Sequence, residues 1–308
     1  MRCSLLVPCR NGARYLPRLW ATVRAQTRPF DECVVFDDAS DDGTSAEAGR
    51  LGATVLHSPH RIGAPAARNR LLAAATGDWV HFHDADDTLA PGFLAAMLGR
   101  ADERADVVLC NVDWLDEASG QTCSEWRYRE DDYRERPVAS LIQNTVGGIG
   151  GLYRRDVLRR IGGFDASLPY WEDTDLHIRL ARAGARFAVV DEVLCFAYRR
   201  SDSLSNGNLR GVWRAKSDLL ARLLDDAPPA ARSAVAADAE LIARRQVRLG
   251  AIADARRSLD VCRRAGGMPP TTRRAALRWL AAHATPTGAF LLQEWTHVLA
   301  EQFSWKSS

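Results

Sequence analysis

The feature that most constrains the fold is a regular alternation of strand-like and helix-like segments over about the first 110 residues. Short runs rich in β-branched and apolar residues are separated by segments with helical periodicity. The strand-like runs are 3–8, 32–38, 53–57, 78–82 and 105–112, and the helical segments are 13–25, 44–50, 64–75 and 91–100. Such an alternation indicates an α/β fold, in which a mostly parallel central sheet has helices on both faces.

Acidic residues follow two of these strand-like runs at the point where each run ends. Asp37 and Asp38 close the second run, and Asp84, Asp86 and Asp87 follow the fourth. In open parallel sheets, ligands bind beyond the carboxyl ends of the strands. The two clusters therefore predict a ligand-binding site at that edge of the sheet.

The rest of the chain divides into three parts. Residues 113–150 are less regular, and they precede a second ordered block whose segment 186–200 reads as a pair of strands. From about Leu209 the chain is rich in Ala, Leu and Arg at helical spacing, with Pro- and Gly-containing breaks, which predicts four or five helices. We therefore expect an α/β domain over 1–207 and an all-helical C-terminal region over 208–308.

The composition excludes several function classes. The 308 residues carry a formal net charge of +2 and contain no basic run with interleaved aromatic residues, so we expect no nucleic-acid binding. We expect no signal peptide, since the opening strand-like run is short, and no apolar stretch reaches about 20 residues, which predicts a chain that is soluble or rests on a membrane surface. The seven cysteines form no C-x-x-C pair, which favours a reducing cytoplasm.

The stretch "HDADDTL" after the fourth run fits two different chemistries. It satisfies the D-x-D-x-T pattern in which the first aspartate, here Asp84, is the nucleophile of a phosphatase. That chemistry normally uses the first strand and a lysine, whereas the only lysines of this chain are Lys216 and Lys306. Alternatively, since strand side chains alternate, Asp84 and Asp86 point to one side and suit a divalent cation. In a third interpretation the acidic residues only cap the next helix and face solvent.

Four separated stretches of the chain resemble the family-two inverting glycosyltransferases, which have a GT-A fold. "LLVPCRNGARYLPRLWATVRAQT" is similar to the opening strand and helix of that family, and "CVVFDDASDDGT" to its V-D-D-G-S-x-D-G-T segment, with Ala39 in place of glycine. "RIGAPAARNRLLAAATGDWVHFHDADD" and "GGFDASLPYWEDTDLHIRLARAG" resemble its G-x-x-x-A-R-N…D-x-D-D and G-G-F-D…E-D-x-D-L segments. On these stretches, which cover about Leu5–Ser205, the chain is identified as a member of that family.

The resemblance implies transfer of a sugar from a nucleotide diphosphate sugar to an acceptor hydroxyl, with inversion at the anomeric carbon. Asp86, with Asp84 nearby, would hold Mn²⁺ or Mg²⁺ against the diphosphate. Asp173 in "WEDTD", next to Glu172, would be the general base, and a place near a helix N-terminus keeps it ionised. Without the resemblance, Glu172, Asp173 and Asp175 read as ordinary acidic residues of a first helical turn.

The implied nucleotide site draws on the ends of the first, second and fourth strands. Asp38 would accept a hydrogen bond from a uracil or thymine N–H, with Asp37 adjacent. A turn-stabilising role is the alternative in this segment, and it suits Asp41 and Asp42 better. Arg68 would approach the ribose or the diphosphate, and a structural ion pair is an equal alternative for it. The other residues implied for nucleotide binding are Pro8, Arg10, Asp84 and Ala85.

One segment departs from the family's pattern. Many members have a histidine in Y-R-x-H-x-x-S, whereas this chain reads "YRRSDSLS", with Ser201 in that place. The diphosphate contacts would then fall to Arg199 and Arg200, and Asp202 is a candidate for an additional metal ligand.

Acceptor contacts are expected near the general base. Trp171 could stack on a sugar ring, and Asn144 and Gly147–Gly151 could let a chain approach closely; packing and a tight turn explain these residues equally well. His81 and His83 are expected to be packed or hydrogen-bonded and not metal ligands.

The resulting prediction is a cytoplasmic, metal-dependent glycosyltransferase that uses a UDP-sugar and a saccharide or lipid-linked saccharide acceptor in bacterial surface polysaccharide synthesis. The alternatives are a non-catalytic relative that binds nucleotide sugars or glycans, and the D-x-D-x-T phosphatase. The helices of 208–308 could pack against the catalytic domain, form a homo-oligomer, or contact the inner membrane peripherally. The aromatic candidates for such membrane contact are Trp295, Phe303 and Trp305.

Overall fold

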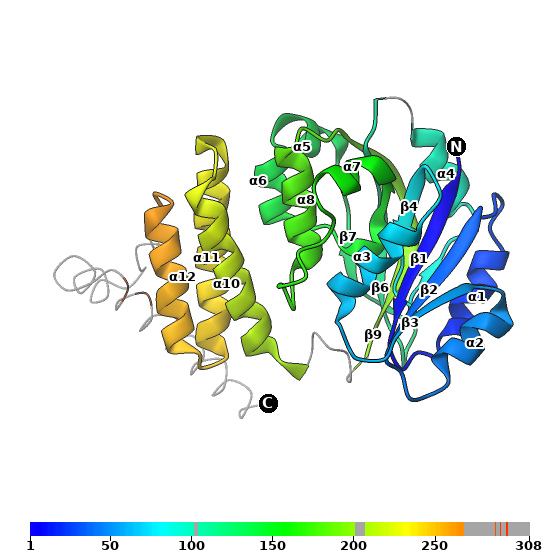
Figure 1. The fold of residues 1–308 in the computed structure, drawn as a ribbon. Coiled ribbons are helices and arrows are strands. Elements are labelled where there is room, and N and C mark those ends of the chain that lie inside the picture. The colour runs from blue at the N-terminus through cyan, green and yellow to red at the C-terminus, as the bar shows by residue number, and fades with distance from the viewer. Residues whose placement is uncertain (102–103, 201–206, 268–286, 288–289, 291–293, 295–308) are drawn as a thin grey trace. The chain divides into compact units, whose positions relative to one another are not determined.

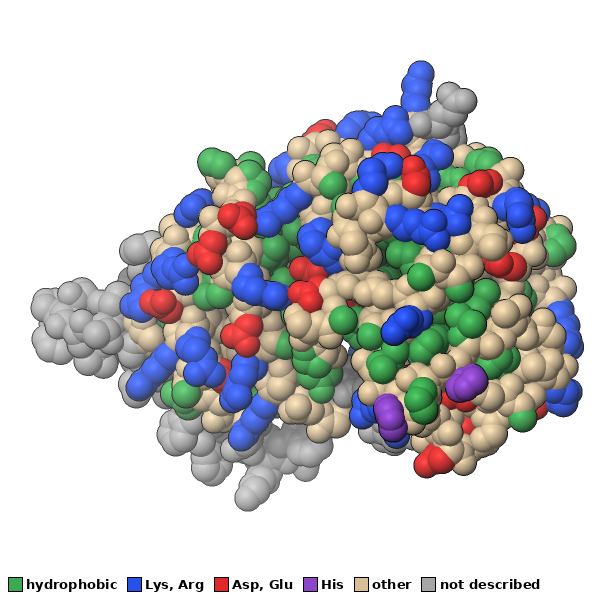
Figure 2. Space-filling view, viewed as in Figure 1, with side chains coloured by type: hydrophobic (Ala, Val, Ile, Leu, Met, Phe, Trp, Pro, Cys, Tyr) green, Lys and Arg blue, Asp and Glu red, His purple; other side chains and the backbone are tan. Residues whose placement is uncertain are grey.

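The structure is a computed structural model, and it describes residues 1–101, 104–200, 207–267, 287, 290 and 294. The chain forms two compact units, Met1–Ser203 and Leu204–Ser308 (Figure 1). The strands and both acidic clusters lie in the first unit, and the described part of the second unit is helical. On the face drawn in Figure 2, Arg and Lys side chains are interspersed with Asp and Glu side chains. None of the described helices combines the length and the apolarity needed to cross a membrane.

One sheet with helices packed against it makes up the first unit (Figure 1). Its strands are β1 (Cys3–Cys9), β2 (Glu32–Asp38), β3 (Thr54–Ser58), β4 (Trp79–Phe82), β5 (Thr88–Leu89), β6 (Val107–Asp116), β7 (Thr122–Trp126), β8 (Gly151–Arg154) and β9 (Phe187–Arg199). Its helices are α1 (Leu16–Arg24), α2 (Thr44–Leu51), α3 (Ala64–Ala74), α4 (Phe93–Arg100), α5 (Glu130–Glu135), α6 (Pro137–Gln143), α7 (Arg155–Arg160) and α8 (Glu172–Arg182), with a 3-10 turn, η1 (Gly148–Gly150).

The parallel half of the sheet contains the first four predicted strands. Its order is β3-β2-β1-β4, and each neighbouring pair is parallel. β1 and β4 are buried along nearly their whole length, as is typical of parallel strands covered by helices on both faces. Leu5 and Val7 of β1 share one hydrophobic core with Leu16 and Leu19 of α1. Because these strands run in one direction, the acidic residues that end β2 and those that follow β4 lie at the same edge of the sheet.

Beyond β4 the sheet is mixed. β8 lies antiparallel between β4 and β6, β9 is parallel to β6, and β5 and β7 pair antiparallel with β9 and β6. Segment 186–200 forms one long strand, β9, so the predicted pair of strands is wrong. Asp191 and Glu192, which resemble a turn in the sequence, form a bulge: Cys110 pairs with Val190, and Asn111 already pairs with Val193. The predicted α/β fold with flanking helices is confirmed.

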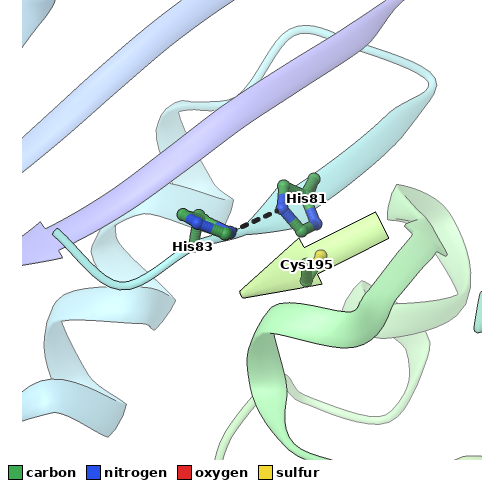
Figure 3. A group of neighbouring side chains, drawn as sticks. All are labelled: His81, His83 and Cys195. Atoms are coloured by element: carbon green, nitrogen blue, oxygen red, sulfur yellow. Dashed lines mark hydrogen bonds between the residues drawn. The ribbon is translucent and has the colours of Figure 1, made fainter. Parts of the chain in front are cut away.

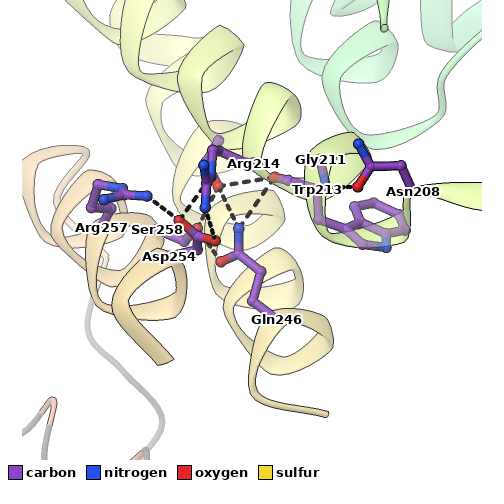
Figure 4. Close-up of polar contacts among 9 residues, drawn as sticks. Asn208, Gly211, Trp213, Arg214, Gln246, Asp254, Arg257 and Ser258 are labelled. Atoms are coloured by element: carbon purple, nitrogen blue, oxygen red, sulfur yellow. Dashed lines mark hydrogen bonds and ion pairs between the residues drawn. The ribbon is translucent and has the colours of Figure 1, made fainter. Parts of the chain in front are cut away.

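A buried polar network joins the described helices of the second unit, α10 (Leu209–Asp225), α11 (Pro229–Arg248) and α12 (Ile252–Arg264). Gln246 Nε2 donates to Ser217 Oγ at 3.1 Å, and Ser258 Oγ donates to Gln246 Oε1 at 2.7 Å. Arg214 donates to both carboxylate oxygens of Asp254 at 3.1 Å (Figure 4). Satisfied buried polar groups of this kind favour one register of the helices over others. The remaining predicted helices, with Trp295, Phe303 and Trp305, lie outside the described residues.

Candidate active site

The aspartates that follow β4 lie in a tight turn. The Asp87 amide donates to the Asp84 carbonyl at 3.2 Å, and the Asp87 carboxylate accepts from the Tyr198 amide at 3.0 Å. Because the chain turns here, the strand alternation that placed Asp84 and Asp86 on one side does not apply to them. Their side chains contact two different arginines instead, and Ala85 between them is buried.

Arg68 of α3 joins this turn to the start of α8. Its Nη2 donates to Asp84 Oδ1 at 2.9 Å, and its Nη1 donates to Glu172 Oε1 at 2.6 Å. Only 8% of the Arg68 side chain is exposed, and its guanidinium lies over the Phe164 ring. Burial alone would lower the pKa of Arg68, but the charges of nearby carboxylates outweigh burial and raise it. Asp173 is one of these carboxylates, so Arg68 brings the D-x-D turn and the W-E-D segment into one electrostatic unit.

Arg200 contacts the other aspartate of the turn. Its Nη2 donates to Asp86 Oδ2, and its guanidinium lies over the Tyr15 ring, 4.3 Å from the ring centroid. Burial and then the charge of Asp84 raise the pKa of Asp86, and Arg200 only partly offsets them. Asp86 is therefore a carboxylate whose ionised form gains from additional positive charge.

The start of α8 carries backbone strain at a predicted site residue. Trp171, the N-cap residue, has a φ of 64°, a left-handed conformation that is an outlier for a bulky side chain. Such strain costs about 1–3 kcal/mol and is commonly found at functional sites. Asp175, by contrast, is an ordinary acidic residue of this turn, because it pairs with Arg179 at 2.7 Å.

Asp38 lies at the predicted place but already has two backbone partners. Its carboxylate oxygens accept from the amides of Ile62 and Gly63 at 2.6 and 2.9 Å, and the side chain is buried. These bonds hold the loop between β3 and α3 against the end of β2. A nucleobase contact would have to use the remaining acceptor capacity of the carboxylate.

The neighbouring Asp37 likewise stabilises a turn. It accepts from the Ser40 amide at 3.0 Å and from the Ser45 hydroxyl. The turn-stabilising role that we expected of Asp41 and Asp42 therefore extends to Asp37. Asp42 does have that role, since its carboxylate accepts from the Thr44 amide at 3.1 Å.

The loops after β1 and β2 contain two further left-handed residues. Asn11 follows the predicted Arg10 and has a φ of 52°, and Ala39 has a φ of 57°. Ala39 stands where the family's pattern has glycine, so its backbone keeps the conformation that glycine adopts more easily. Pro8 lies in β1 opposite Phe36, and Arg10 is exposed just beyond the strand.

The residues at the end of β9 separate into two groups. Arg199 is exposed and its guanidinium lies 5.9 Å from the centroid of the Trp114 ring, whereas Arg200 contacts the D-x-D turn. Ser201 and Asp202 lie outside the described residues, so the additional metal ligand stays a prediction.

The glycine-rich segment before β8 is closely packed. A Cβ atom on Gly147 would lie 2.1 Å from the Trp126 ring, and one on Gly151 would lie 2.1 Å from the Tyr153 hydroxyl. Of the two explanations for this segment, packing is the one that these contacts favour.

His81 and His83 of the β4 region form a hydrogen-bonded pair in the core (Figure 3). His81 Nδ1 lies 2.8 Å from the Gly151 carbonyl, so it carries the proton, and His81 Nε2 accepts from His83 Nδ1 at 3.1 Å. Burial lowers the pKa of His83 to about 3, which keeps it neutral. Cys195 Sγ lies within 4.8 Å of both rings and donates to the Ile149 carbonyl. The hydrogen-bonded packing expected for the two histidines is present.

The described part of the first unit, which contains the D-x-D turn, has no lysine of the kind that a phosphatase would need. Lys216 is buried in α10 of the second unit, 3.5 Å from Asp238, and Lys306 lies outside the described residues. The position opposite Asp84 is held by Arg68.

Known proteins resemble this chain in sequence and in fold. The model of the family described as Glycosyl transferase family 2 matches residues 4–162. The pre-mycofactocin glycosyltransferase of Mycobacterium tuberculosis is 34% identical over 194 residues, 59% of this chain and 40% of that protein. The succinoglycan biosynthesis protein ExoU of Rhizobium meliloti is 26% identical over 253 residues, 74% of this chain and 72% of that protein. The chain thus spans less than half the length of the mycobacterial relative.

Two solved structures have a similar fold. Residues 1–349 of TarS from Staphylococcus aureus give a TM-score of 0.64 at 20% identity, covering 97% of this chain and 92% of that one. The mannosyltransferase PcManGT from Pyrobaculum calidifontis, in complex with GDP-Man and Mn²⁺, gives a TM-score of 0.61 at 22% identity, covering 100% and 88%. The predicted GT-A fold is confirmed. Because the family model matches about half of the chain, including the D-x-D turn, the chain belongs to glycosyl transferase family 2.

Proposed function

We propose that residues 1–207 form a catalytic domain that transfers a sugar from a nucleotide diphosphate sugar to an acceptor hydroxyl with inversion. The observation that carries this proposal is the Arg68 bridge, which joins Asp84 of the D-x-D turn to Glu172 beside the proposed base. A donor-holding segment and a proton-accepting segment must lie together for such a transfer. A UDP-sugar is the first donor to test, and GDP-sugars follow, because a structural neighbour was solved with GDP-Man.

Asp86 and Asp84 would hold Mn²⁺ or Mg²⁺. Carboxylate oxygens suit these hard cations, and two carboxylates close enough for Asp84 to raise the pKa of Asp86 favour a cation between them. The arginine on each carboxylate, Arg68 or Arg200, is a positive group at the place where the cation would bind. When bound, the metal supplies a Lewis acid for the departing diphosphate.

Asp173 would act as the general base. The acceptor oxygen forms a bond to the anomeric carbon while the bond from that carbon to the diphosphate breaks, and the hydroxyl proton passes to Asp173. Asp173 lies in the first turn of α8, at the positive end of the helix, and its charge acts on the nearby Arg68. Glu172 would position Arg68, and the strained Trp171 would stack on the acceptor sugar.

The nucleotide would lie across the ends of β1, β2 and β4. Arg68 would then contact the donor while it keeps its carboxylate partners, and Arg199 and Arg200 would contact the diphosphate. The other residues proposed for this site are Pro8, Arg10, Asp37, Asp38, Asp84 and Ala85. Asp38 has acceptor capacity for a base N–H, since an ionised carboxylate offers about four lone-pair sites and two are used.

The product we propose is a surface polysaccharide or its lipid-linked precursor, which the resemblance to a succinoglycan biosynthesis protein supports. A cytoplasmic location fits the cysteines, since all seven, each in the described part of the chain, are thiols and not disulfides. The C-terminal helices would contact the inner membrane or a second copy of the chain.

A nucleotide-sugar screen with the Asp173→Asn variant tests this function. Thermal unfolding with UDP- and GDP-sugars, with and without Mn²⁺, should show stabilisation of both proteins by the same nucleotide, whereas only the wild type should transfer sugar. Asp156→Asn, which changes an exposed carboxylate in the first turn of α7, is the matched control and should keep full activity.

The outcomes separate the alternatives. Near-wild-type transfer by Asp173→Asn would show that another group is the base. Stabilisation only by phosphate monoesters would favour the phosphatase, and nucleotide-sugar binding without turnover of any acceptor would favour a non-catalytic relative.

A further inference from the structure

A basic pocket lies beside the D-x-D turn of the first unit. Its volume is about 700 Å³, within the range typical of ligand sites. Four arginines line it against one aspartate and one glutamate, which gives the lining residues a formal charge of +2. Only two of the residues proposed for the donor and for catalysis, Arg199 and Arg200, belong to this lining. Its other two arginines are four residues apart in the sequence: Arg14 precedes α1 and Arg18 lies in its first turn.

Aromatic rings hold the arginines in place. Arg14 and Arg200 lie over the Tyr15 ring, 4.5 and 4.3 Å from its centroid, and Arg18 lies over the Tyr198 ring at 3.9 Å. Stacking on a ring orients a guanidinium without neutralising it. The pocket therefore presents oriented positive groups.

The carboxylates of the lining only partly balance this charge. Glu117 is shared, because it lies 3.0 Å from Arg18 and 3.8 Å from Arg200. Asp116 accepts from the amide and the hydroxyl of Ser119 at 2.8 Å, which ties it to its own turn. The lining thus has more positive charge than its own acidic residues balance.

The pocket adjoins the proposed donor site at Asp86, which two arginines of the pocket contact. Arg18 donates to the carbonyl of Asp86, and Arg200 contacts its carboxylate. A molecule bound in the pocket would therefore lie next to the place proposed for the donor diphosphate.

We propose that this pocket binds a phosphate group of the acceptor substrate, so that the acceptor is an anionic, phosphate-bearing saccharide. This rests on the proposed function. Guanidinium groups bind phosphate oxygens in bidentate fashion, and several arginines in one pocket suit the charge of a phosphate better than that of a neutral sugar. The phosphate belongs to a saccharide diphosphate on a lipid or to a phosphodiester within a polysaccharide, and both offer the same oxygens.

Titration with inorganic phosphate tests the pocket without knowledge of the acceptor. The wild-type protein, saturated with UDP and Mg²⁺, should bind phosphate by calorimetry. Arg14→Gln and Arg18→Gln should each weaken phosphate binding about tenfold, because each removes one charge-assisted hydrogen-bond donor. UDP affinity should stay within about twofold. Arg50→Gln, which changes an exposed arginine of α2, should change neither affinity.

Unchanged phosphate affinity in Arg14→Gln would overturn the proposal, and this exposed residue can be replaced with little risk to folding. Competition between phosphate and UDP would also overturn it, since the pocket would then be part of the donor site. If no nucleotide binds at all, the proposed function fails, while phosphate titration of the nucleotide-free protein still decides the pocket.

Two acceptor mixtures distinguish the sources of the phosphate. One contains vesicles with a prenyl diphosphate saccharide, and the other contains a soluble phosphodiester-linked oligosaccharide. If Arg14→Gln lowers transfer to one of these acceptors at least tenfold, the proposal is supported, and that acceptor is the source of the phosphate. Equal transfer to acceptors with and without phosphate would contradict it.

Discussion

Two acidic pairs end strands at the same edge of the sheet, and they have different partners. Asp37 and Asp38 at the end of β2 accept hydrogen bonds from backbone amides of neighbouring loops and from the hydroxyl of Ser45 in α2. Asp84 and Asp86 after β4 contact the guanidinium groups of arginines from distant segments. The two pairs are alike in residue type and in position at the sheet edge. The pair of β2 is bonded mainly to backbone amides, whereas the pair after β4 is bonded to long arginine side chains.

The difference teaches which carboxylates can change partners. An amide that loses its acceptor must be compensated by movement of its loop, so Asp37 and Asp38 at the end of β2 must keep these partners, and a nucleotide contact has to use their remaining acceptor capacity. Arg200 can turn to another anion while a cation takes its place on Asp86. The pair after β4 is therefore the better metal site. Three substitutions test this contrast, and a fourth tests the strained backbone of Ala39, next to Asp38.

The largest effect is expected for Asp86→Ala. We expect transfer to fall roughly 10³-fold, about 4 kcal/mol in the activation barrier, because the leaving diphosphate would lose the metal that we propose on this carboxylate. The free energy of unfolding should change by less than about 1 kcal/mol, since only a partly exposed ion pair is lost. An activity assay measures the loss of transfer, and urea unfolding measures the change in stability. A large loss of stability with retained transfer would show that Asp86 has a structural role and not a role in metal binding.

Asp38→Ala should lower stability, which Asp86→Ala should leave nearly unchanged. Two backbone amides lose a charged acceptor, so we expect the free energy of unfolding to fall by about 3 kcal/mol. Asp41→Ala, at an exposed neighbour, is the control and should leave stability within about 0.5 kcal/mol. A stability unchanged by Asp38→Ala would mean that the bonds to Ile62 and Gly63 do not hold their loop, and the contrast between the two pairs would fail.

Arg200→Gln tests whether a metal ion and Arg200 compete for Asp86. Without nucleotide, the variant should bind Mn²⁺ about tenfold more tightly, because the cation no longer displaces a guanidinium from Asp86. The gain in Mn²⁺ affinity that UDP gives the wild type should shrink in parallel. Manganese titration followed by electron paramagnetic resonance measures both, and weaker Mn²⁺ binding in the variant would argue against exchange.

Ala39→Gly gives the smallest effect. The left-handed φ of 57° costs a residue with a Cβ about 1 kcal/mol, so glycine should raise the free energy of unfolding by about that amount. Ala46→Gly, in the exposed face of α2, is the control and should lower it by about 1 kcal/mol. Urea unfolding of both variants at one pH decides this, and a loss of stability in Ala39→Gly would show that the alanine methyl has a packing role.

The parallel half of the fold was predictable from the sequence because its strands are local, continuous apolar runs. β1 and β4 each form a buried strand near the predicted bounds. The mixed half was not predictable in the same way, since β8 inserts between β4 and β6 from a distant segment. The bulge at Asp191 and Glu192 was not predictable either. Two exposed acidic residues between apolar runs are found in bulged strands as well as in turns, so the sequence does not distinguish the two.

In the candidate site, too, only part of the structure could be predicted from the sequence. The resemblance could name the residues of the D-x-D turn and of the W-E-D segment, but it could not name their partners. That Arg68 contacts Asp84 and Glu172 at once depends on how α3, β4 and α8 come together in three dimensions. The engagement of Asp38 with two amides depends likewise on the path of the loop after β3.

The Arg68 contact has a consequence for how this site tolerates change. One nitrogen of the guanidinium contacts each carboxylate, so the separation of Asp84 and Glu172 is set by the covalent dimensions of a planar group. Insertions or deletions in the loops between these segments could alter the surface without altering that separation. Lysine, with a single nitrogen at its tip, could not maintain it. In this site, precision comes from one rigid side chain and not from the length of the chain that connects its parts.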